Sequence, residues 1–158
     1  MELLGIARAL HVLAVVLWIG GVAMVTTVLL PAVRELHGDD APAAFSRLER
    51  RFAAQSRWTT LIAGATGFYL AYAMNLWGRF AEARYWWMHA MVGVWALFTL
   101  MLFVLEPLVV HRMLAQRAQR DPAGTVALMT RMHWVLTALG LVTIAGAVAG
   151  SHGVLIFG

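Results

Sequence analysis

Four long apolar stretches dominate the sequence, and shorter segments between them hold most of the charged residues. Each stretch reaches the roughly 20 residues that a helix needs to cross the hydrocarbon core of a bilayer. We therefore predict membrane-spanning helices at residues 5–32, 57–77, 85–110 and 132–157. Successive antiparallel helices with short connections pack as a bundle. The pattern thus predicts an all-α, antiparallel four-helix bundle that forms a single domain over residues 1–158.

The composition narrows the class of protein further. Hydrophobic residues make up 61% of the 158 residues and charged residues only 13%, against about a quarter charged in a typical soluble domain. A chain of this length has too little interior to bury so much apolar surface, which excludes an ordinary soluble enzyme. The high hydrophobicity also excludes a disordered chain. The absence of cysteine excludes disulfides and thiolate metal sites.

The arginines predict how the chain is oriented in the membrane. All twelve basic residues are arginine, and nine of them lie between the first and second or between the third and fourth stretches. Because arginine accumulates on the cytoplasmic side of membrane proteins, both termini should face outward. The net charge of +4 then reflects the arginines that orient the chain in the membrane. We expect a multi-pass protein of the bacterial inner membrane. Its partner would be the lipid bilayer, and we expect no binding to nucleic acid.

Three histidines lie at similar depth on three different predicted helices. His11 and His89 are near the outer ends of the first and third stretches, and His152 is near the outer end of the fourth. An ionisable side chain inside a membrane usually faces the bundle interior or a cofactor, and imidazole binds haem iron, copper or zinc. One such histidine alone is more often a hydrogen-bonded packing residue. The three together predict a cofactor or metal site.

A weaker set of candidate ligands consists of His111, His133, Met88 and Met91. His111 and His133 share the predicted cytoplasmic face, where they would form a second site or stay solvated beside arginines. Met88 and Met91 flank His89, and a thioether is a soft ligand for Cu(I) or an axial ligand for haem. Methionine also commonly fills gaps in a core.

Glu106 is the only carboxylate within a predicted span, and Pro107 follows it directly. Proline kinks a helix or leaves a carbonyl without its donor. Glu106 would accept protons or pair with an arginine of a neighbouring helix; the alternative is a glutamate that reaches water at the membrane surface. At the outer face, the candidates to pair with haem propionates are Arg8, Arg79 and Arg84.

Small residues indicate close helix packing at two places. Gly146 and Gly150 form a GxxxG motif in the fourth stretch, and Ala63 and Gly67 have the same spacing in the second. Such pairs let helices approach closely, either within one bundle or in a homo-oligomer.

The first stretch contains a motif that resembles two membrane protein families. The segment HVLAVVLWIGG, which begins at His11, is similar to the first-helix signature of the copper-resistance protein D membrane domain, and HemJ-type protoporphyrinogen oxidases have a similar spacing of His, Trp and Gly. Trp18 lies two turns from His11 on the same helix face, so both could line one pocket. Further along, FSRL at Phe45 resembles the copper-resistance domain, and WMHA at Trp87 resembles the HemJ pattern.

The two resemblances imply different activities. HemJ-type proteins bind haem b and oxidise protoporphyrinogen IX, whereas the copper-resistance family is associated with copper movement across the inner membrane. The HemJ motif has a lysine two residues after the histidine of the third helix. Met91 occupies that position here, and the chain contains no lysine. This departure argues against the oxidase activity and leaves His11 and His89 as candidate haem ligands.

The sequence supports three hypotheses about function. The first is a haem-b-binding membrane protein that transfers electrons or performs redox chemistry on a quinone, a porphyrin or a redox protein, which leaves an oxidoreductase activity open. The second is a copper-handling protein with His11, His89, His152, Met88 and Met91 as ligands. The third is a cofactor-free assembly subunit of a membrane complex.

Overall fold

The computed structural model describes residues 2–35 and 40–154, and these residues form helices joined by short turns, with no strand among them. The predicted all-α class is therefore confirmed for the described part of the chain. In chain order the elements are α1 (Glu2–Met24), the π-helix η1 (Val25–Leu29), α2 (Leu30–Glu35), α3 (Asp40–Ala73), the 3₁₀ helices η2 (Trp77–Ala81) and η3 (Ala83–Tyr85), α4 (Trp86–Leu100), the π-helix η4 (Met101–Val110), α5 (His111–Arg120) and α6 (Pro122–Ser151).

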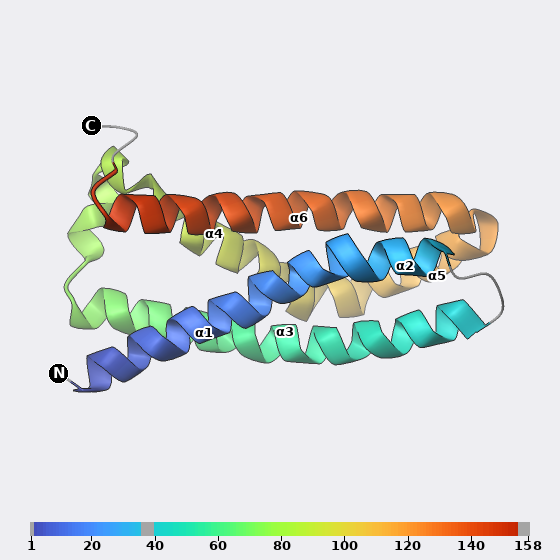
Figure 1. The fold of residues 1–158 in the computed structure, drawn as a ribbon, viewed down its shortest axis with the longest axis horizontal. Helices are drawn as coiled ribbons and strands as arrows, with labels where there is room; N and C mark the ends of the chain where they lie inside the picture. The colour runs from blue at the N-terminus through green and yellow to red at the C-terminus, as the bar shows by residue number, and fades with distance from the viewer. Residues whose placement is uncertain (1, 36–39, 155–158) are drawn as a thin grey trace.

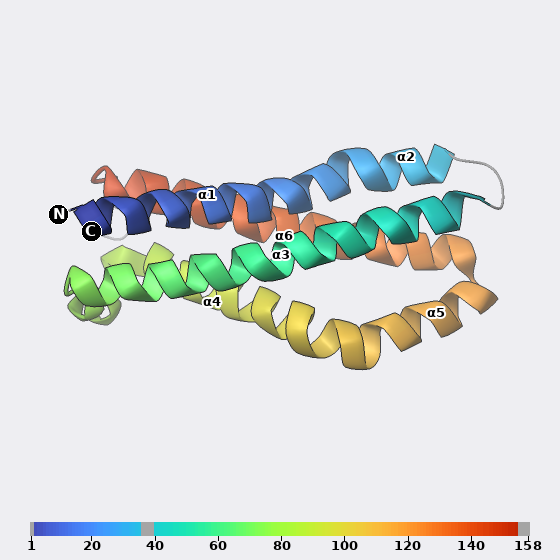
Figure 2. The same cartoon turned by 90° about the horizontal axis from the view of Figure 1, so that it is seen from below.

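The long helices run alongside one another in alternating directions (Figure 1). α1 packs along α3 and also touches α6, while α4 packs against α6 and α3, so the contacts close into a ring. Figure 2 shows the same helices after a turn of 90° about the long axis of the molecule. The start of α1, the end of α6 and the segment η2–η3 lie at the same end of the molecule, which we call the hairpin end (Figure 1).

Within the described residues, three helical stretches are long and apolar enough to cross a membrane: Glu2–Ala32, Ala83–Val109 and Ala123–Ser151. They overlap the first, third and fourth predicted spans. The fourth, predicted at 132–157, begins earlier, at Ala123, and ends at Ser151, so residues 152–154 lie beyond the helix, and residues 155–157 lie outside the described residues. The second predicted span, 57–77, forms the last part of α3 and is not among them. The reason is compositional, because this part of α3 contains Arg57 and two tyrosines and has no valine, whereas valine is frequent in the other three stretches.

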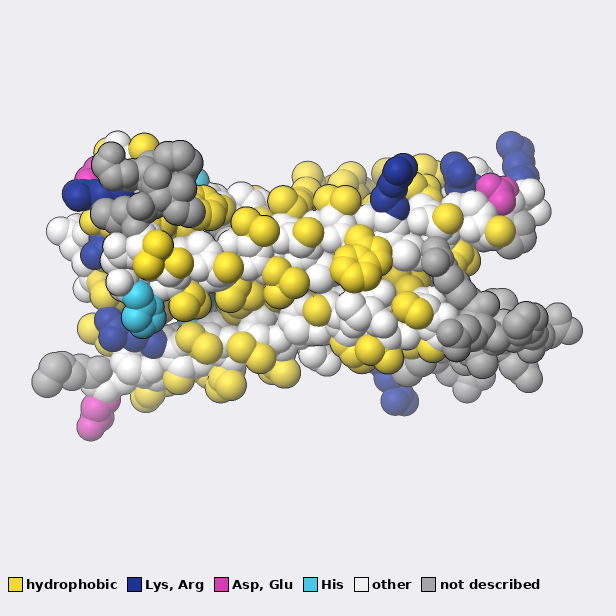
Figure 3. Space-filling view, turned by 45° about the horizontal axis from the view of Figure 1, so that its top comes forward, with side chains coloured by type: hydrophobic (Ala, Val, Ile, Leu, Met, Phe, Trp, Pro, Cys, Tyr) yellow, Lys and Arg dark blue, Asp and Glu magenta, His cyan; other side chains and the backbone are white. Residues whose placement is uncertain are grey.

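The surface between the two ends of the molecule is mostly apolar. Leu13, Leu108 and Val142, on three different helical stretches, are 58%, 65% and 61% exposed. Figure 3 shows hydrophobic side chains over the length of one face, with charged side chains gathered toward its ends. An apolar surface of this extent is unfavourable in water and is typical of contact with lipid.

Aromatic and small polar side chains fill the centre of the helix ring. Trp18 is only 4% exposed and packs edge-on against Phe98 of α4, with their ring centroids 4.9 Å apart. Nearer the end opposite the hairpin, Thr26 donates to the Val22 carbonyl at 2.7 Å, and Thr137 Oγ1 of α6 lies 2.7 Å from Thr26 Oγ1. Because the Thr26 hydrogen is already used, Thr137 is the donor of the second bond. Such interhelical hydrogen bonds hold helices together in lipid.

The GxxxG motif of α6 packs within the chain. Gly146 lies against the ring of Trp86 and Gly150 against the ring of Trp87, so closely that a Cβ at either glycine would collide with the indole. The start of α4 therefore docks on α6 at the hairpin end. Of the two interpretations of this motif, packing within one bundle is the one that the structure confirms.

Replacing Gly150 with alanine should destabilise the protein, although alanine favours a helix by about 1 kcal/mol over glycine. The added Cβ would meet the Trp87 ring, and overpacking of this kind typically costs ~1–3 kcal/mol. The matched control is Gly93→Ala in α4, where nothing lies within 4 Å of the added Cβ. We expect a lower thermal unfolding midpoint in detergent for Gly150→Ala and an unchanged or higher one for Gly93→Ala. Equal midpoints would contradict this packing.

Candidate functional site

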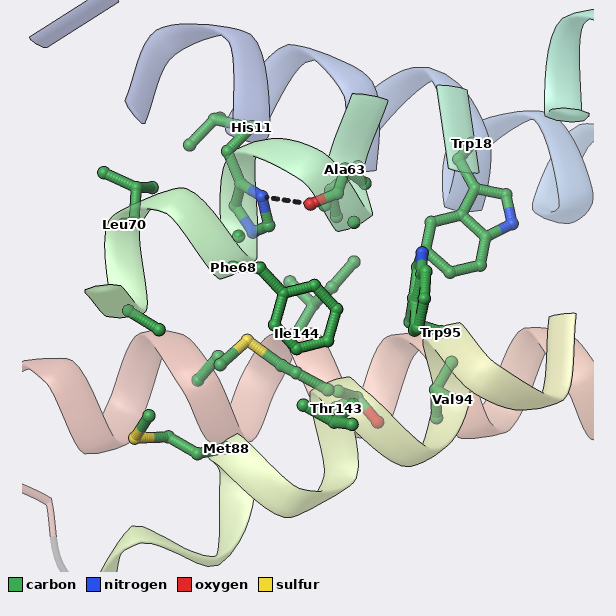
Figure 4. A pocket seen from close by; sticks show the side chains of 18 of the residues that line it. His11, Trp18, Ala63, Phe68, Leu70, Met88, Val94, Trp95, Thr143 and Ile144 are labelled. Atoms are coloured by element: carbon green, nitrogen blue, oxygen red, sulfur yellow. Dashed lines mark hydrogen bonds between the residues drawn. The ribbon is translucent and has the colours of Figure 1, made fainter. Parts of the chain in front are cut away.

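A cavity of about 460 Å³ lies between α1, α3, α4 and α6, in the half of the molecule near the hairpin end (Figure 4). Trp77 and Phe80 of η2 line it at that end, and most of its remaining wall is apolar, as at Phe68, Val94 and Ile144. Ligand sites in proteins are typically apolar cavities of roughly 300–1,000 Å³ with a few polar groups. This cavity is therefore the candidate functional site.

His11 of α1 is the only titratable side chain among the described residues that line the cavity. Its Nδ1 is 3.0 Å from the Ala63 carbonyl oxygen and 3.1 Å from Thr66 Oγ1, both on α3. A carbonyl oxygen can only accept, and the Thr66 hydroxyl donates to the Ile62 carbonyl at 2.6 Å, so Nδ1 must be the donor. Nε2 then carries the free lone pair, and this is the form of imidazole that binds a metal or accepts a hydrogen bond.

Small residues of α3 form the seat for this imidazole. Ala63 is 4% exposed, and Gly67 lies one turn further along the same helix face. A Cβ at Gly67 would lie 3.0 Å from His11 Cε1 and 3.4 Å from His11 Nδ1. The small-residue pair noted in the sequence thus lets the imidazole lie directly against α3.

Trp18 and Trp95 form the floor of the cavity on the side away from the hairpin end (Figure 4). Trp95 lies over Gly64 and donates its Nε1 hydrogen to the Thr60 carbonyl oxygen at 3.0 Å. Trp18 and His11 line the same cavity, as their spacing along one helix face predicts.

Three methionines, Met74, Met88 and Met91, line the cavity together with His11. Met88 is 7% exposed. The sulfur of Met74 accepts a hydrogen bond from Arg8 Nη2 at 3.3 Å, which places this arginine beside the cavity wall. The lining therefore combines one imidazole with thioether groups, which are soft ligands.

His89 and His152 do not line the cavity. His89 is exposed and packs edge-on against Phe80, with ring centroids 5.2 Å apart. His152 is also exposed, and its Nδ1 donates to the Val148 carbonyl at 2.8 Å at the end of α6. In residues 2–35 and 40–154, no group of three or more His, Asp or Glu could hold a metal ion. The three histidines are not brought together, because similar depth on three helices does not fix the direction in which each side chain points.

Of the two histidines in the weaker set, the structure describes the side chain of His133 only. His133 is half-buried, and its Nδ1 donates to the Met129 carbonyl of its own helix at 2.9 Å. The side chain of His111 lies outside the described residues. The structure thus gives His133 a local hydrogen bond within α6.

The arginines predicted to bind propionates lie at the hairpin end. Arg79 and Arg84 flank Tyr85, with guanidinium carbons 5.0 and 5.1 Å from the ring centroid, and Arg84 also pairs with Glu82. Both are therefore engaged within the hairpin. Arg8 contacts a residue of the cavity wall and is the best placed of the three to meet an anionic group there.

Glu106 lies outside the cavity, in the π-helix η4. Its Oε2 pairs with Nη2 of Arg57 on α3 at 3.3 Å, so the arginine partner expected on a neighbouring helix is present. The same arginine donates from Nε to the Leu102 carbonyl oxygen at 3.3 Å. In a π-helix that carbonyl would accept from the residue five positions on, which is Pro107, and proline has no N–H. Arg57 thus supplies the donor that Pro107 lacks.

Sequence reasoning did not single out Trp95, Thr66 or Arg57 for these roles. Trp95 and Thr66 belong to no motif, and their partners are set by helix register. One feature of the sequence could have pointed to Arg57. Pro107 interrupts the third predicted span, and Arg57 lies at a similar depth on the preceding helix.

Comparison of the chain with protein-family models, with curated proteins and with solved structures found no match. The resemblance to the copper-resistance and HemJ-type families therefore stays an expectation from motifs.

Replacing Pro107 with alanine restores a backbone N–H at this position. The hydrogen bond from Arg57 to the Leu102 carbonyl should then contribute less to stability. We expect Arg57→Met to destabilise the chain by about 1–3 kcal/mol, because the Leu102 carbonyl loses its donor. In a Pro107→Ala background the same substitution should cost less, since the helix can then satisfy this carbonyl itself. A double-mutant cycle on the free energy of unfolding in mixed micelles measures the difference, with Glu106→Gln reporting the part due to the ion pair. Strictly additive effects would contradict the assignment.

Proposed function

We propose that the chain crosses the bacterial inner membrane four times as an antiparallel four-helix bundle with both termini outside. The closed ring of contacts supports this proposal, because it flanks the less apolar α3 with α1 and α4. The excess of arginine in the segments between the first and second and between the third and fourth helices supports the orientation. The hairpin end is then the outer end, and the Arg57–Glu106 pair lies toward the inner end.

We further propose that the cavity binds haem b and that the protein carries electrons or performs redox chemistry on a membrane-soluble partner such as a quinone or a porphyrin. The observation that carries this proposal is the hydrogen bond from His11 Nδ1 to the Ala63 carbonyl, which leaves the Nε2 lone pair free, so that His11 would be a residue that holds the haem iron. Met88 and Met91 also line this cavity, and a thioether sulfur of one of them would be a further group able to hold the iron. An apolar wall with these donors fits a haem group.

Bound haem would supply the one-electron chemistry, and the chain would supply orientation and environment. His11 is held in one tautomer and one orientation by Ala63 and Thr66. The rings of Trp18 and Trp95 close the floor of the cavity. Arg8 lies where it can pair with an anionic group beside the cavity wall.

Copper handling is the second candidate function. One histidine and three methionines line a single cavity, and imidazole and thioether groups are ligands that suit Cu(I). No carboxylate belongs to the described lining, which disfavours a hard cation.

An absorption spectrum, oxidised and dithionite-reduced, of protein purified in detergent from cells supplied with a haem precursor tests the first candidate. We expect a Soret band with sharp reduced α and β bands. His11→Ala should abolish or shift the bands, because it removes the one imidazole among the described residues that line the cavity. His89→Ala and His152→Ala are the matched controls and should leave the spectrum unchanged. One of Met88→Leu and Met91→Leu should shift the reduced bands.

The other outcomes separate the hypotheses. Bands that persist unaltered in His11→Ala would overturn the ligand assignment. Copper in elemental analysis without a Soret band, and its loss in His11→Ala, would favour copper handling. Neither haem nor copper, together with a co-purifying membrane protein, would indicate an assembly subunit.

Substituting Gly67 should disturb the same site without removing a ligand. The Cβ of Gly67→Ala would lie 3.0 Å from His11 Cε1, so the imidazole must move. We expect a shifted Soret band or weaker retention of haem on dilution. Gly20→Ala on α1, where nothing lies within 4 Å of the new Cβ, should behave like the unsubstituted protein. Identical behaviour of the two variants would argue against contact between the cofactor and His11.

A further inference from the structure

Three buried polar atoms lack a hydrogen-bond partner among the described residues: Trp18 Nε1, Ser56 Oγ and Thr60 Oγ1. Their residues are only 4%, 2% and 0% exposed. Buried polar groups of this kind are rare in folded proteins, since leaving one unpaired costs about 1–3 kcal/mol. Three of them in one molecule point to an occupant that bonds to them.

The register of α1 and α3 puts these groups close to one level along the bundle. Gln55 Nε2 of α3 donates to the Leu17 carbonyl of α1 at 3.4 Å. In this antiparallel pairing Ser56 stands at the level of Trp18, and Thr60 follows one turn later on the same face of α3. The three residues therefore lie within about 6 Å of one another along the bundle axis, which is the rise of four helical residues, and we call this part of the interface one layer.

This layer lies next to the cavity, and Arg57 of the Arg57–Glu106 pair is at its level, between Ser56 and Thr60 in α3. On the cavity side, Trp95 bonds to the Thr60 carbonyl and leaves the Thr60 hydroxyl without a partner. Figure 4 shows the Nε1 edge of Trp18 turned away from His11. Arg57 follows Ser56 directly in α3, and its side chain is 38% exposed. The layer is thus adjacent to a residue that reaches the surface.

We propose that Trp18, Ser56 and Thr60 hold internal water beneath the cavity. The groups match water chemically, because the indole N–H only donates while each hydroxyl both donates and accepts. A buried water makes about three hydrogen bonds to polar groups that otherwise lack partners. A metal ion would find no charged ligand in this set, and an anion would find no cation. The inference holds whatever occupies the cavity, so it does not rest on the haem proposal.

Water in this layer would give the cavity floor a polar connection toward the inner end of the bundle. The surrounding core is formed by apolar residues such as Ala14, Val22 and Phe98. Protons move along hydrogen-bonded water and hydroxyl groups but not through such an apolar core. The connection would therefore run past Ser56 toward Arg57 and Glu106.

NMR of the tryptophan indole groups tests for this water. The protein has seven tryptophans; with indole ¹⁵N labelling in detergent, Trp18 and Trp95 are assigned by Trp→Phe substitution. We expect magnetisation transfer from water to the buried Trp18 indole hydrogen, and weaker transfer to that of Trp95, which is bonded to the Thr60 carbonyl. The double variant Ser56→Ala, Thr60→Val should lose the transfer to Trp18.

Thr59→Val is the matched control. It removes a hydroxyl from the same turn of α3 that already donates to the Gln55 carbonyl at 3.0 Å, so transfer to Trp18 should persist. Unchanged positions of the other indole signals show that a variant is folded. If the double variant does not fold, Ser56→Ala alone should reduce the transfer. Absence of transfer to Trp18 in the unsubstituted protein, or its persistence at full strength in the folded Ser56 and Thr60 variants, would overturn the proposal.

Discussion

The hydrogen bond from His11 Nδ1 to the Ala63 carbonyl is the contact on which the candidate site depends. It joins α1 to α3, selects the tautomer of the imidazole in the cavity wall and leaves Nε2 with a free lone pair. This bond requires the two helices to approach closely, which the missing side chain at Gly67 permits. The bulky rings of Trp18 and Trp95 then fill the next layer, so the open space is confined to the half of the bundle that holds His11.

Threonine side chains satisfy polar groups of this interior in a recurring way. Such hydrogen bonds matter because a lipid environment has no water to bond to these groups. Thr66 donates its hydroxyl hydrogen to the Ile62 carbonyl of its own helix and accepts from His11. Thr26 donates to the Val22 carbonyl in the same way and accepts from Thr137. A threonine that donates locally and accepts from a neighbouring helix can join two helices without leaving a buried hydrogen unpaired. Ser56 and Thr60 depart from this pattern, and the departure draws attention to their layer.

The helical class and the membrane character could be predicted from the sequence, because they depend on the length and composition of apolar stretches. The direction of individual side chains could not. His89 and Met88 are neighbours at the same depth, but one residue turns a helix by about 100°, so Met88 lines the cavity and His89 is exposed. His11 could be singled out because it is an isolated polar residue in an apolar stretch. Its partners on α3 depend on interhelical register, which a single sequence does not encode in any local pattern.

The break at Pro107 accounts for one charged residue of α3, Arg57. The proline leaves the Leu102 carbonyl without a backbone donor, and an arginine is the side chain that can reach it from α3. That arginine would be costly at this depth without an anion, and Glu106 provides one at 3.3 Å. The glutamate, the proline and the arginine are each unfavourable alone and acceptable together. Because α3 also offers the Ala63 carbonyl to α1 and the Thr60 carbonyl to α4, it serves both neighbours with polar groups. Arg57 and these two backbone carbonyls therefore make α3 the helix that supplies polar partners to both of its neighbours in the ring.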